Sequence, residues 1–245
     1  MSRSNPTQQA VSPVVRYYEW DGGYDADVMP DNQPGGRVCY YDKESKKRVH
    51  VDCPFNFLLL DDERFSVTGW DEETRTSYFS NEAKSAKEVL KVRGRSGGQT
   101  NIEVVEGSWE NIKDKGNFRY TKHLYIAVEN DGQLEICMMR VTGAFFAAYV
   151  DFVKKNKRYE IKFSVSDREK KKKGKTIFFA PVLKALPVGE DESEVAMELD
   201  KQLQAYFKDR AGSKPQEAPP SDELDMVEEE SGDEGFEASD EEVPF

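Results

Sequence analysis

The chain has 245 residues, 37% hydrophobic and 11% aromatic, which is enough to bury one sizeable core and suits one or two domains. Its formal net charge of −12, from 47 acidic and 35 basic residues, by itself argues against a nucleic-acid-binding protein. The longest nearly apolar run, residues 141–150, is far shorter than the roughly 20 residues of a membrane-spanning helix, so we expect no membrane partner. Three cysteines, an odd number, and a polar N-terminal stretch without a hydrophobic leader favour a reducing, cytoplasmic location.

The first hundred residues predict short strands separated by turns. We expect strands at residues 14–20, 37–41, 48–53, 55–60 and 65–70. The second and third flank the polar turn 42–47, a pattern typical of a β-hairpin. Residues 80–92 begin with a serine cap and predict a helix, which the glycine-rich stretch 93–99 ends.

The second half predicts three strands, one helix and two strands. The strands are expected at 101–107, 123–130, 134–141, 158–166 and 175–183, and the helix at 142–156. This is the chain order of an OB-fold, a five-stranded Greek-key barrel that often binds single strands. The prediction is therefore a mainly β fold with flanking helices, an OB-fold core at about 99–186 and an N-terminal extension before it. A last helix at about 191–209 completes a DNA-binding domain over residues 1–210.

The charge is distributed unevenly along the chain. Residues 211–245 hold 13 of the 47 acidic residues but only one of the 35 basic ones, so the first 210 residues carry 34 of each. Such an acidic segment has little apolar surface to offset the entropy lost on ordering, and we expect residues 211–245 to form a disordered tail. The neutral body removes the electrostatic objection to nucleic-acid binding.

A basic segment lies inside the neutral body. Residues 154–175 contain 11 basic and three acidic residues, and the part at 166–175 reads as a flexible loop between the last two strands. In an OB-fold that loop borders the binding groove, where lysines would contact phosphates. A solvated surface loop is the alternative. The predicted phosphate contacts are Lys154, Lys155, Lys157, Arg158, Lys162, Lys170, Lys171, Lys172, Lys173 and Lys175.

Aromatic residues on polar faces of strands are candidates for stacking on bases. Trp70 alternates with Ser66 and Thr68, and Tyr125 alternates with Thr121 and His123. Phe178 follows Thr176 next to the lysine loop. Each of the three could instead be a half-buried packing residue, and we favour Tyr125 and Phe178 for stacking because their strands adjoin the basic segment.

The acidic tail ends on a proline and a bulky aromatic residue. A solubility tail gains nothing from Phe245, whereas a pocket on a partner could bury its ring. The sequence EEVPF resembles the acidic tail of bacterial and phage single-stranded-DNA-binding proteins, which end on a hydrophobic residue, Pro and Phe. Glu241, Glu242, Val243, Pro244 and Phe245 match that tip, and the long body suits a divergent phage-encoded member, located in the host cytoplasm.

This resemblance implies sequence-independent binding and protection of single-stranded DNA in replication, recombination and repair, without catalysis or a cofactor. It also implies that the tip recruits replication and recombination proteins, such as a polymerase, a helicase or primase, or a nuclease. The acidic tail would compete with DNA for the basic segment, because a flexible linker keeps its carboxylates at a high local concentration. The protein could also form a homo-oligomer.

Three other hypotheses can be drawn from the residues. Asp151, Glu160 and Lys162 have the carboxylate and E-x-K spacing of metal-dependent nucleases, although Asp151 falls in a predicted helix. Cys39 and His50 would be cross-strand neighbours with Cys53 nearby, but zinc would need a fourth ligand such as Cys137 or His123, so we predict no metal site. A histone-type chaperone would explain the tail but neither the lysines nor the terminal Phe.

Overall fold

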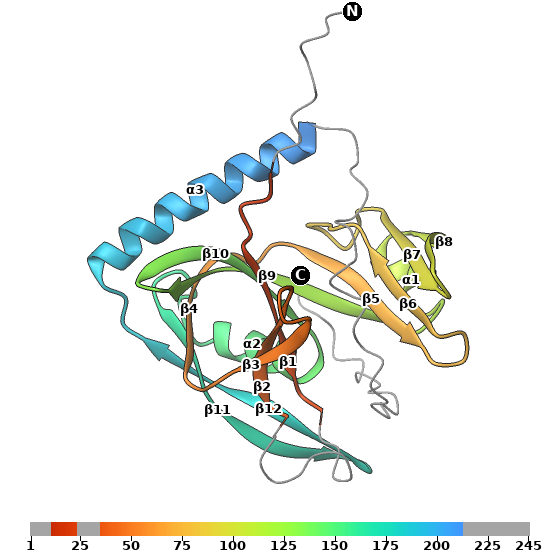
Figure 1. The fold of residues 1–245 in the computed structure, drawn as a ribbon, viewed down its shortest axis with the longest axis horizontal. Coiled ribbons are helices and arrows are strands. Elements are labelled where there is room, and N and C mark those ends of the chain that lie inside the picture. The colour runs from red at the N-terminus through yellow and green to blue at the C-terminus, as the bar shows by residue number, and fades with distance from the viewer. Residues whose placement is uncertain (1–10, 24–34, 213–245) are drawn as a thin grey trace, which may run out of the picture.

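The computed structural model describes residues 11–23 and 35–212. In these residues twelve strands form one mixed sheet, accompanied by three helices (Figure 1). The strands are β1 (Arg16–Asp21), β2 (Arg37–Asp42), β3 (Lys47–Val51), β4 (Phe55–Asp61), β5 (Phe65–Asp71), β6 (Thr76–Ser80), β7 (Leu90–Ser96), β8 (Gln99–Gly107), β9 (Phe118–Asn130), β10 (Gln133–Val141), β11 (Lys162–Lys173) and β12 (Thr176–Leu186). The helices are α1 (Trp109–Ile112), α2 (Gly143–Val153) and α3 (Glu190–Gly212).

The long strand β9 organises the sheet. β10 runs antiparallel along one edge of it, from Gln133 opposite Asn130 to Val141 opposite Lys122. Two strands share the other edge, because β4 pairs with the second half of β9 and β5 pairs with the first half. β4 and β5 therefore follow one another along β9, and the sheet continues from each of them in a different direction.

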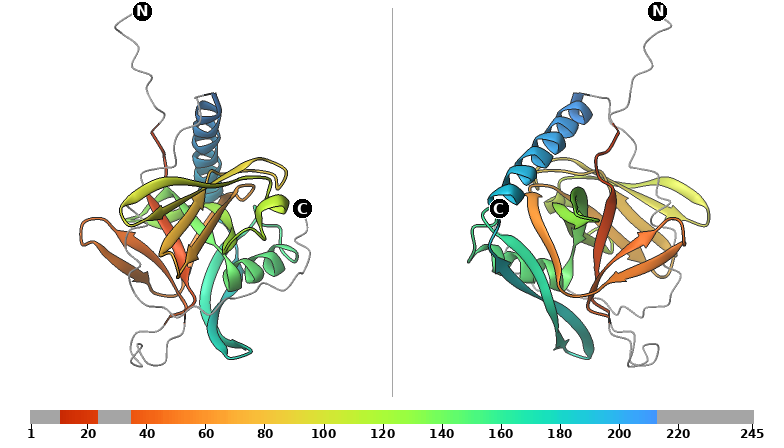
Figure 2. Two further views of the ribbon diagram at one scale, coloured as in Figure 1. Left: turned by 90° about the vertical axis from the view of Figure 1, so that its right-hand side faces the viewer. Right: turned by 60° about the vertical axis from the view of Figure 1, so that its left-hand side comes forward.

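On the side of β4 the sheet closes into a ring. β4 pairs with β11 and β11 with β12, while β10 pairs with β1 in parallel. The Phe179 amide donates to the Gly22 carbonyl at 2.9 Å, and the Trp20 indole donates to the Phe179 carbonyl at 3.0 Å. These contacts join β12 to the end of β1, so that β1, β10, β9, β4, β11 and β12 enclose a common interior, as the views in Figure 2 show.

The interior of the ring is the main hydrophobic core. Helix α2 contributes Phe145 and Tyr149 to it, and Phe145 contacts Trp20 edge-on with 5.6 Å between ring centroids. The buried members are Tyr18, Val38, Phe55, Phe57, Leu59, Leu124, Ile126, Val128, Cys137, Met139, Val141, Phe145, Tyr149, Phe163 and Val165. Strand alternation supplies them, because every second residue of each strand faces inward.

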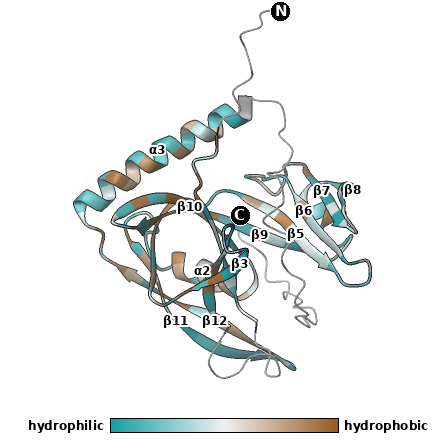
Figure 3. Ribbon diagram, in the orientation of Figure 1, coloured by the Kyte–Doolittle hydropathy of each residue, from teal (hydrophilic) through white to brown (hydrophobic). Residues whose placement is uncertain are grey.

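The outer face of β4, β9 and β10 is also buried, because α3 packs across it. Leu58 and Leu60 of β4, which alternate with the inward residues, contact the same cluster as Leu203 and Phe207 of α3. Figure 3 shows hydrophilic and hydrophobic residues alternating along α3, as expected for a helix that buries one side. Burial on both faces explains the continuous apolar run at residues 57–60.

On the side of β5 the sheet extends into a lobe made of β5, β6, β7 and β8. Its own core contains Phe65, Val67, Leu90, Val92 and Ile112, with Tyr120 of β9 packed against them. The Phe65 and Tyr120 rings stack with 4.6 Å between centroids. The short helix α1 closes the end of this core through Ile112.

The structure confirms several predicted elements. The mainly β content is as expected, and α2 and α3 lie within a few residues of the helices predicted at 142–156 and 191–209. The hairpin β2–β3 pairs Cys39 with His50, as its turn predicted. The hairpin β9–β10 turns at Asp131 and Gly132, whose φ angles of 50° and 80° are those of a type I′ turn.

Three expectations about elements are corrected. Residues 101–107 form β8, which pairs with β7 at the end of the lobe, and β4 takes the place beside β9 that the barrel prediction gave them. Residues 80–92 are not a helix, because Ala83 exchanges two backbone hydrogen bonds of 2.9 Å with Phe65. Residues 166–173 extend β11, paired with β12 as far as Lys173 opposite Thr176, so the predicted flexible loop is a β-ribbon.

Candidate nucleic-acid interface

The basic segment 154–175 divides into two groups. Lys154, Lys155, Lys157 and Arg158 lie at the end of α2 and in the turn that follows it. The later lysines, 170–173 and 175, lie at the far end of the β11–β12 ribbon, which projects from the ring in Figures 1 and 2. The eight residue steps from Lys162, which follows the first group at the start of β11, to Lys170 span roughly 26 Å, and we therefore describe the two groups as separate surfaces.

Most cations of the first group contact carboxylates of the protein. Arg158 binds the buried Asp62 at 3.0 Å, and Lys157 binds Glu160 at 3.1 Å. Lys154 lies 3.9 Å from Asp151. Lys162, at the start of β11, is paired with Glu192 of α3. These ion pairs indicate that Arg158 and Lys162 stabilise the fold. Their place in a basic run of the sequence did not indicate this role.

The second group, which we call the hairpin lysines, consists of Lys170, Lys171, Lys172, Lys173 and Lys175. All five side chains are exposed, and Lys171 makes a solvent-exposed contact of 3.4 Å with Glu169. Because neighbouring strand residues point to opposite faces, both faces of the ribbon carry lysines. A projecting strand pair with cations on both faces can follow a phosphate backbone.

The three predicted stacking residues have different surroundings. Tyr125 is only 3% exposed, its ring packs edge-on against Phe207 of α3, and its hydroxyl donates to Glu82. The prediction that Tyr125 presents an open ring is therefore wrong. Phe178 is half-buried on the ribbon opposite Lys171, and Trp70 is 47% exposed on β5 in the lobe.

A buried polar network surrounds Glu82. One carboxylate oxygen accepts hydrogen bonds from the Tyr125 hydroxyl at 2.5 Å and lies 2.6 Å from Nδ1 of His123, and the other oxygen binds Arg210 of α3 at 2.9 Å. Burial by itself raises the pKa of Glu82, but the hydrogen bond from His123 and the charges of His123 and Arg210 outweigh it and lower the pKa to about 2. The network attaches the last turn of α3 to β9.

The same network contains a Ser–His–Glu arrangement. Ser66 Oγ lies 2.8 Å from Nε2 of His123, whose other nitrogen contacts Glu82. Such spacing resembles a hydrolase triad, yet Ser66 is 6% and His123 5% exposed, and the carboxylate is shared with Tyr125 and Arg210. A nucleophile must meet its substrate, so this closed cluster is a structural one. No sequence pattern indicated it, because its members come from β5, β9, the loop after β6 and α3.

A second buried carboxylate, Asp62, lies at the break between β4 and β5. It accepts hydrogen bonds from the hydroxyls of Tyr149 at 2.6 Å and Tyr159 at 3.0 Å, besides its contact with Arg158. Burial and the nearby Asp62 charge raise the pKa of both tyrosines, so both stay protonated as donors. Asp62 thus connects α2 and the turn before β11 to the β4–β5 edge.

The residues of the nuclease alternative do not converge. Asp151 is exposed on α2 beside Lys154, Glu160 contacts Lys157 in the turn, and Lys162 pairs with Glu192. Among residues 11–23 and 35–212 there is no cluster of three or more His, Cys, Asp or Glu side chains suited to a metal ion. None of these contacts forms the pair of metal-binding carboxylates with an adjacent lysine that the spacing suggested.

The cysteine and histidine residues of the first hairpin make other contacts. Cys39 is buried and its thiol donates to the Glu19 carbonyl at 3.7 Å, while His50 lies 2.8 Å from Asp21. Burial raises the pKa of the Cys39 thiol to about 12, which opposes the thiolate that zinc requires. Cys53 is exposed beyond the end of β3.

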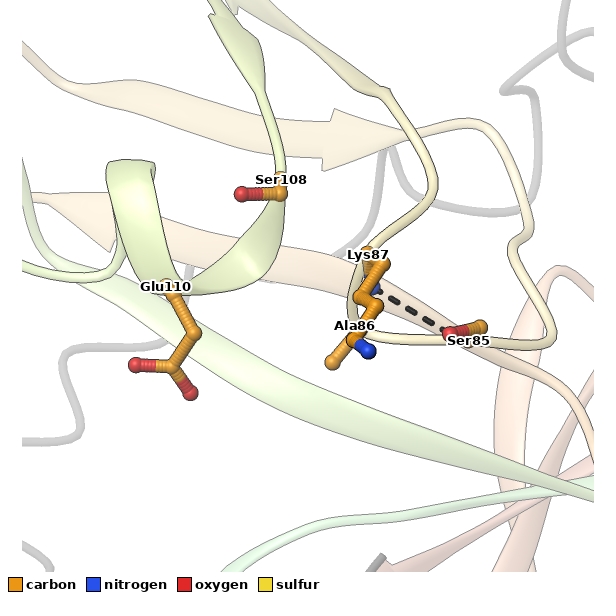
Figure 4. Close-up of a pocket in the computed structure, with 5 residues that line it drawn as sticks. All are labelled: Ser85, Ala86, Lys87, Ser108 and Glu110. Carbon is orange, nitrogen blue, oxygen red and sulfur yellow. Dashed lines mark hydrogen bonds between the residues drawn. The ribbon is translucent and has the colours of Figure 1, made fainter.

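A surface cavity of about 380 Å³ lies in the lobe, between the loop after β6 and the start of α1 (Figure 4). Its lining includes Ser85, Ala86, Lys87, Ser108 and Glu110. The amide of Lys87 donates to Ser85 Oγ, and Glu110 contacts Lys113 at 3.2 Å. None of the predicted site residues borders this cavity. The predicted docking residues 241–245 lie outside the described residues.

None of the helices in residues 11–23 and 35–212 is both long enough and apolar enough to cross a membrane. Comparison of the chain with protein-family models, with curated proteins and with solved structures found no match in any of the three.

Proposed function

We propose that this protein binds single-stranded DNA without sequence preference and protects it during replication or recombination. The observation that carries the proposal is the projecting β11–β12 ribbon with its five exposed hairpin lysines, on a small closed β-structure. Single-strand-binding proteins combine a basic surface that follows the backbone with aromatic rings on which bases stack. Phe178 on the ribbon and Trp70 on the lobe are the rings that we assign to that role.

The connectivity of the ring supports an OB-fold assignment. In chain order β4, β9, β10, α2, β11 and β12 give three strands, a helix and two strands, with β4 paired to both β9 and β11. The departure is β1, which lies between β10 and β12. In OB-folds the loops between strands 1 and 2 and between strands 4 and 5 border the ligand. Here the β5–β8 lobe and the lysine ribbon occupy those two places.

The acidic segment supports the second part of the proposal. We propose that residues 213–245 compete with DNA for the basic surfaces, and that Glu241, Glu242, Val243, Pro244 and Phe245 dock on replication or recombination proteins. A tethered segment with this excess of carboxylates presents a high local concentration of anions. Binding of DNA would then free the segment for partners.

Fluorescence anisotropy with labelled single- and double-stranded oligonucleotides tests the proposal. The full-length protein and a chain ending at Gly212 are titrated at two salt concentrations. We expect tight, salt-sensitive binding with a preference for the single strand, and tighter binding by the shorter chain. Absence of binding by both chains would contradict the proposal and leave protein docking through the tail as the function to examine.

A further inference from the structure

The register of the lobe places four residues on one face. Trp70 of β5 lies opposite Ser77 of β6, and Ser77 lies opposite Arg95 of β7. Residues directly opposite each other in antiparallel strands share a face of the sheet. Trp70 and Arg95 therefore lie on the same face, one strand apart.

The adjacent row adds two more arginines to that face. Thr68 of β5 lies opposite Arg119 of β9 on one side and opposite Phe79 of β6 on the other. Phe79 in turn lies opposite Arg93 of β7. We call Trp70, Arg93, Arg95 and Arg119 the arginine face. The alternate residues, Val67 and Val92 among them, point the other way into the core of the lobe.

The composition of the arginine face suits a polyanion with flat rings. The register positions of this face on β5, β6, β7 and β9 hold Thr68, Trp70, Ser77, Phe79, Arg93, Arg95 and Arg119, and Glu103 of β8 lies opposite Arg93. Trp70 is 47% exposed, and indole is the strongest aromatic partner for cations. Guanidinium groups bind phosphates bidentately and also stack on bases.

The location of the arginine face matters because α3 covers the surface next to it. Tyr125 and Ala127 lie on the same face of β9 as Arg119, but they are buried under α3, with Leu203 and Phe207 packed on them. This covered region corresponds to the outer face of strands 2 and 3 that OB-folds use for single strands. A DNA strand bound to the ribbon must therefore make its further contacts elsewhere. The lobe occupies the place of the loop between strands 1 and 2, the other loop that borders the ligand in OB-folds.

We propose that the arginine face is a second contact surface for single-stranded nucleic acid, in which Arg93, Arg95 and Arg119 bind phosphates and Trp70 stacks on a base. This inference rests on the proposed function and deepens it by assigning a site on the lobe, outside the ring. The sequence did not point to the site, because its four residues come from three strands, β5, β7 and β9, that lie far apart in the chain.

The test uses the full-length protein and a fluorescein-labelled oligothymidylate, with anisotropy measured over a range of salt concentrations. Arg93→Gln/Arg119→Gln removes two positive charges from the arginine face. Lys201→Gln/Lys208→Gln removes two from exposed positions of α3 and serves as the matched control. For single strands each phosphate contact contributes about 0.7 to the slope of log affinity against log salt, so we expect the arginine variant to lose about 1.4 and the control to stay near wild type.

Trp70 provides an independent readout. Trp70→Phe should lose a large part of the tryptophan quenching that oligothymidylate causes, because Trp20 and Trp109 are both packed in cores. Trp70→Ala should weaken binding roughly tenfold, as expected for one stacked base. Circular dichroism of each variant shows whether it is folded, and Trp70→Phe, a mild change, keeps the test valid if Trp70→Ala unfolds.

Four outcomes separate the alternatives. A smaller salt slope for the arginine variant alone, with loss of quenching in Trp70→Phe, supports the arginine face. If wild type binds and the arginine variant behaves as the control does, the arginine face is overturned and the proposed function stands. If wild type fails to bind the oligonucleotide, both fail.

The fourth outcome concerns the acidic segment, which begins where α3 ends beside Glu82 and His123 on this same face. A full-length protein with the 13 tail carboxylates changed to amides reveals whether the arginines bind only that segment. If the arginine change tightens DNA binding in the acidic protein and has no effect in the amide protein, the face holds the tail and not DNA, which overturns the proposal.

Discussion

Arg158 and Lys172 belong to the same basic run of the sequence, yet the protein uses them in opposite ways. Arg158 contacts Asp62, a buried carboxylate that also holds Tyr149 and Tyr159. Lys172 is exposed at the end of the ribbon. A count of cations therefore says little about a binding surface until the carboxylates that each cation contacts are known. Arg158 and Lys162, which contact carboxylates, should affect the stability of the fold, whereas the hairpin lysines should affect ligand binding alone.

Removal of Asp62 should have the largest effect on stability. Asp62→Ala leaves two tyrosine hydroxyls without their acceptor and Arg158 without its partner, so we expect a loss of about 3 kcal/mol. Urea denaturation measures the change. Asp151→Ala, an exposed carboxylate on α2, is the control and should stay within about 0.5 kcal/mol of wild type. Equal losses of unfolding free energy for the two variants would show that the contacts of Asp62 do not stabilise the fold.

The pH dependence of Glu82 gives the second prediction. The pKa of Glu82 is lowered from the usual 4.5 to about 2. Its contribution to the free energy of unfolding is therefore complete above pH 4.5 and disappears as the pH falls toward 2. At neutral pH the contribution is about 3 kcal/mol. Urea midpoints measured from pH 7 to pH 3 should fall for wild type and fall less for Glu82→Gln. Parallel curves for the two proteins would refute the role of this carboxylate.

The pair of Lys162 and Glu192 should contribute less, because both side chains are partly exposed. We expect Lys162→Met to lower the free energy of unfolding by about 1 kcal/mol or less, and thermal denaturation can measure the shift. Single-strand affinity should change little, because Lys162 is engaged by α3. A large loss of affinity in a normally stable variant would return Lys162 to the DNA-contacting group.

The hairpin lysines should give the smallest change in stability. Substitution of Lys170, Lys171, Lys172 and Lys173 by glutamine should leave the unfolding midpoint within about 0.5 kcal/mol of wild type. The salt dependence of single-strand binding should nevertheless lose about 2.8 in slope, or 0.7 for each lost phosphate contact. Unchanged affinity and slope would remove the ribbon from the proposed interface.

Sequence patterns predicted the elements whose conformation depends on residues close together in the chain. The dipeptide Asp131-Gly132 accepts positive φ angles, and the β9–β10 hairpin forms at that point. The apolar spacing in 142–156 predicted α2, and the structure shows that its buried residues are Phe145 and Tyr149. The helix expected at 80–92 failed for a tertiary reason, because the Ala83 backbone pairs with Phe65.

Local sequence patterns were enough to predict the hairpins β2–β3 and β9–β10, the helices α2 and α3, and the separation of a neutral body from an acidic end. Which strand pairs with β9, which cations contact carboxylates and which face of β9 is covered depend on packing between elements that lie far apart in the chain. Tyr125 and Arg119 lie on one face of the same strand, and the alternating pattern predicted an exposed ring at Tyr125. Packing of Phe207 buries the first and leaves the second exposed, because burial depends on an element 80 residues further along the chain.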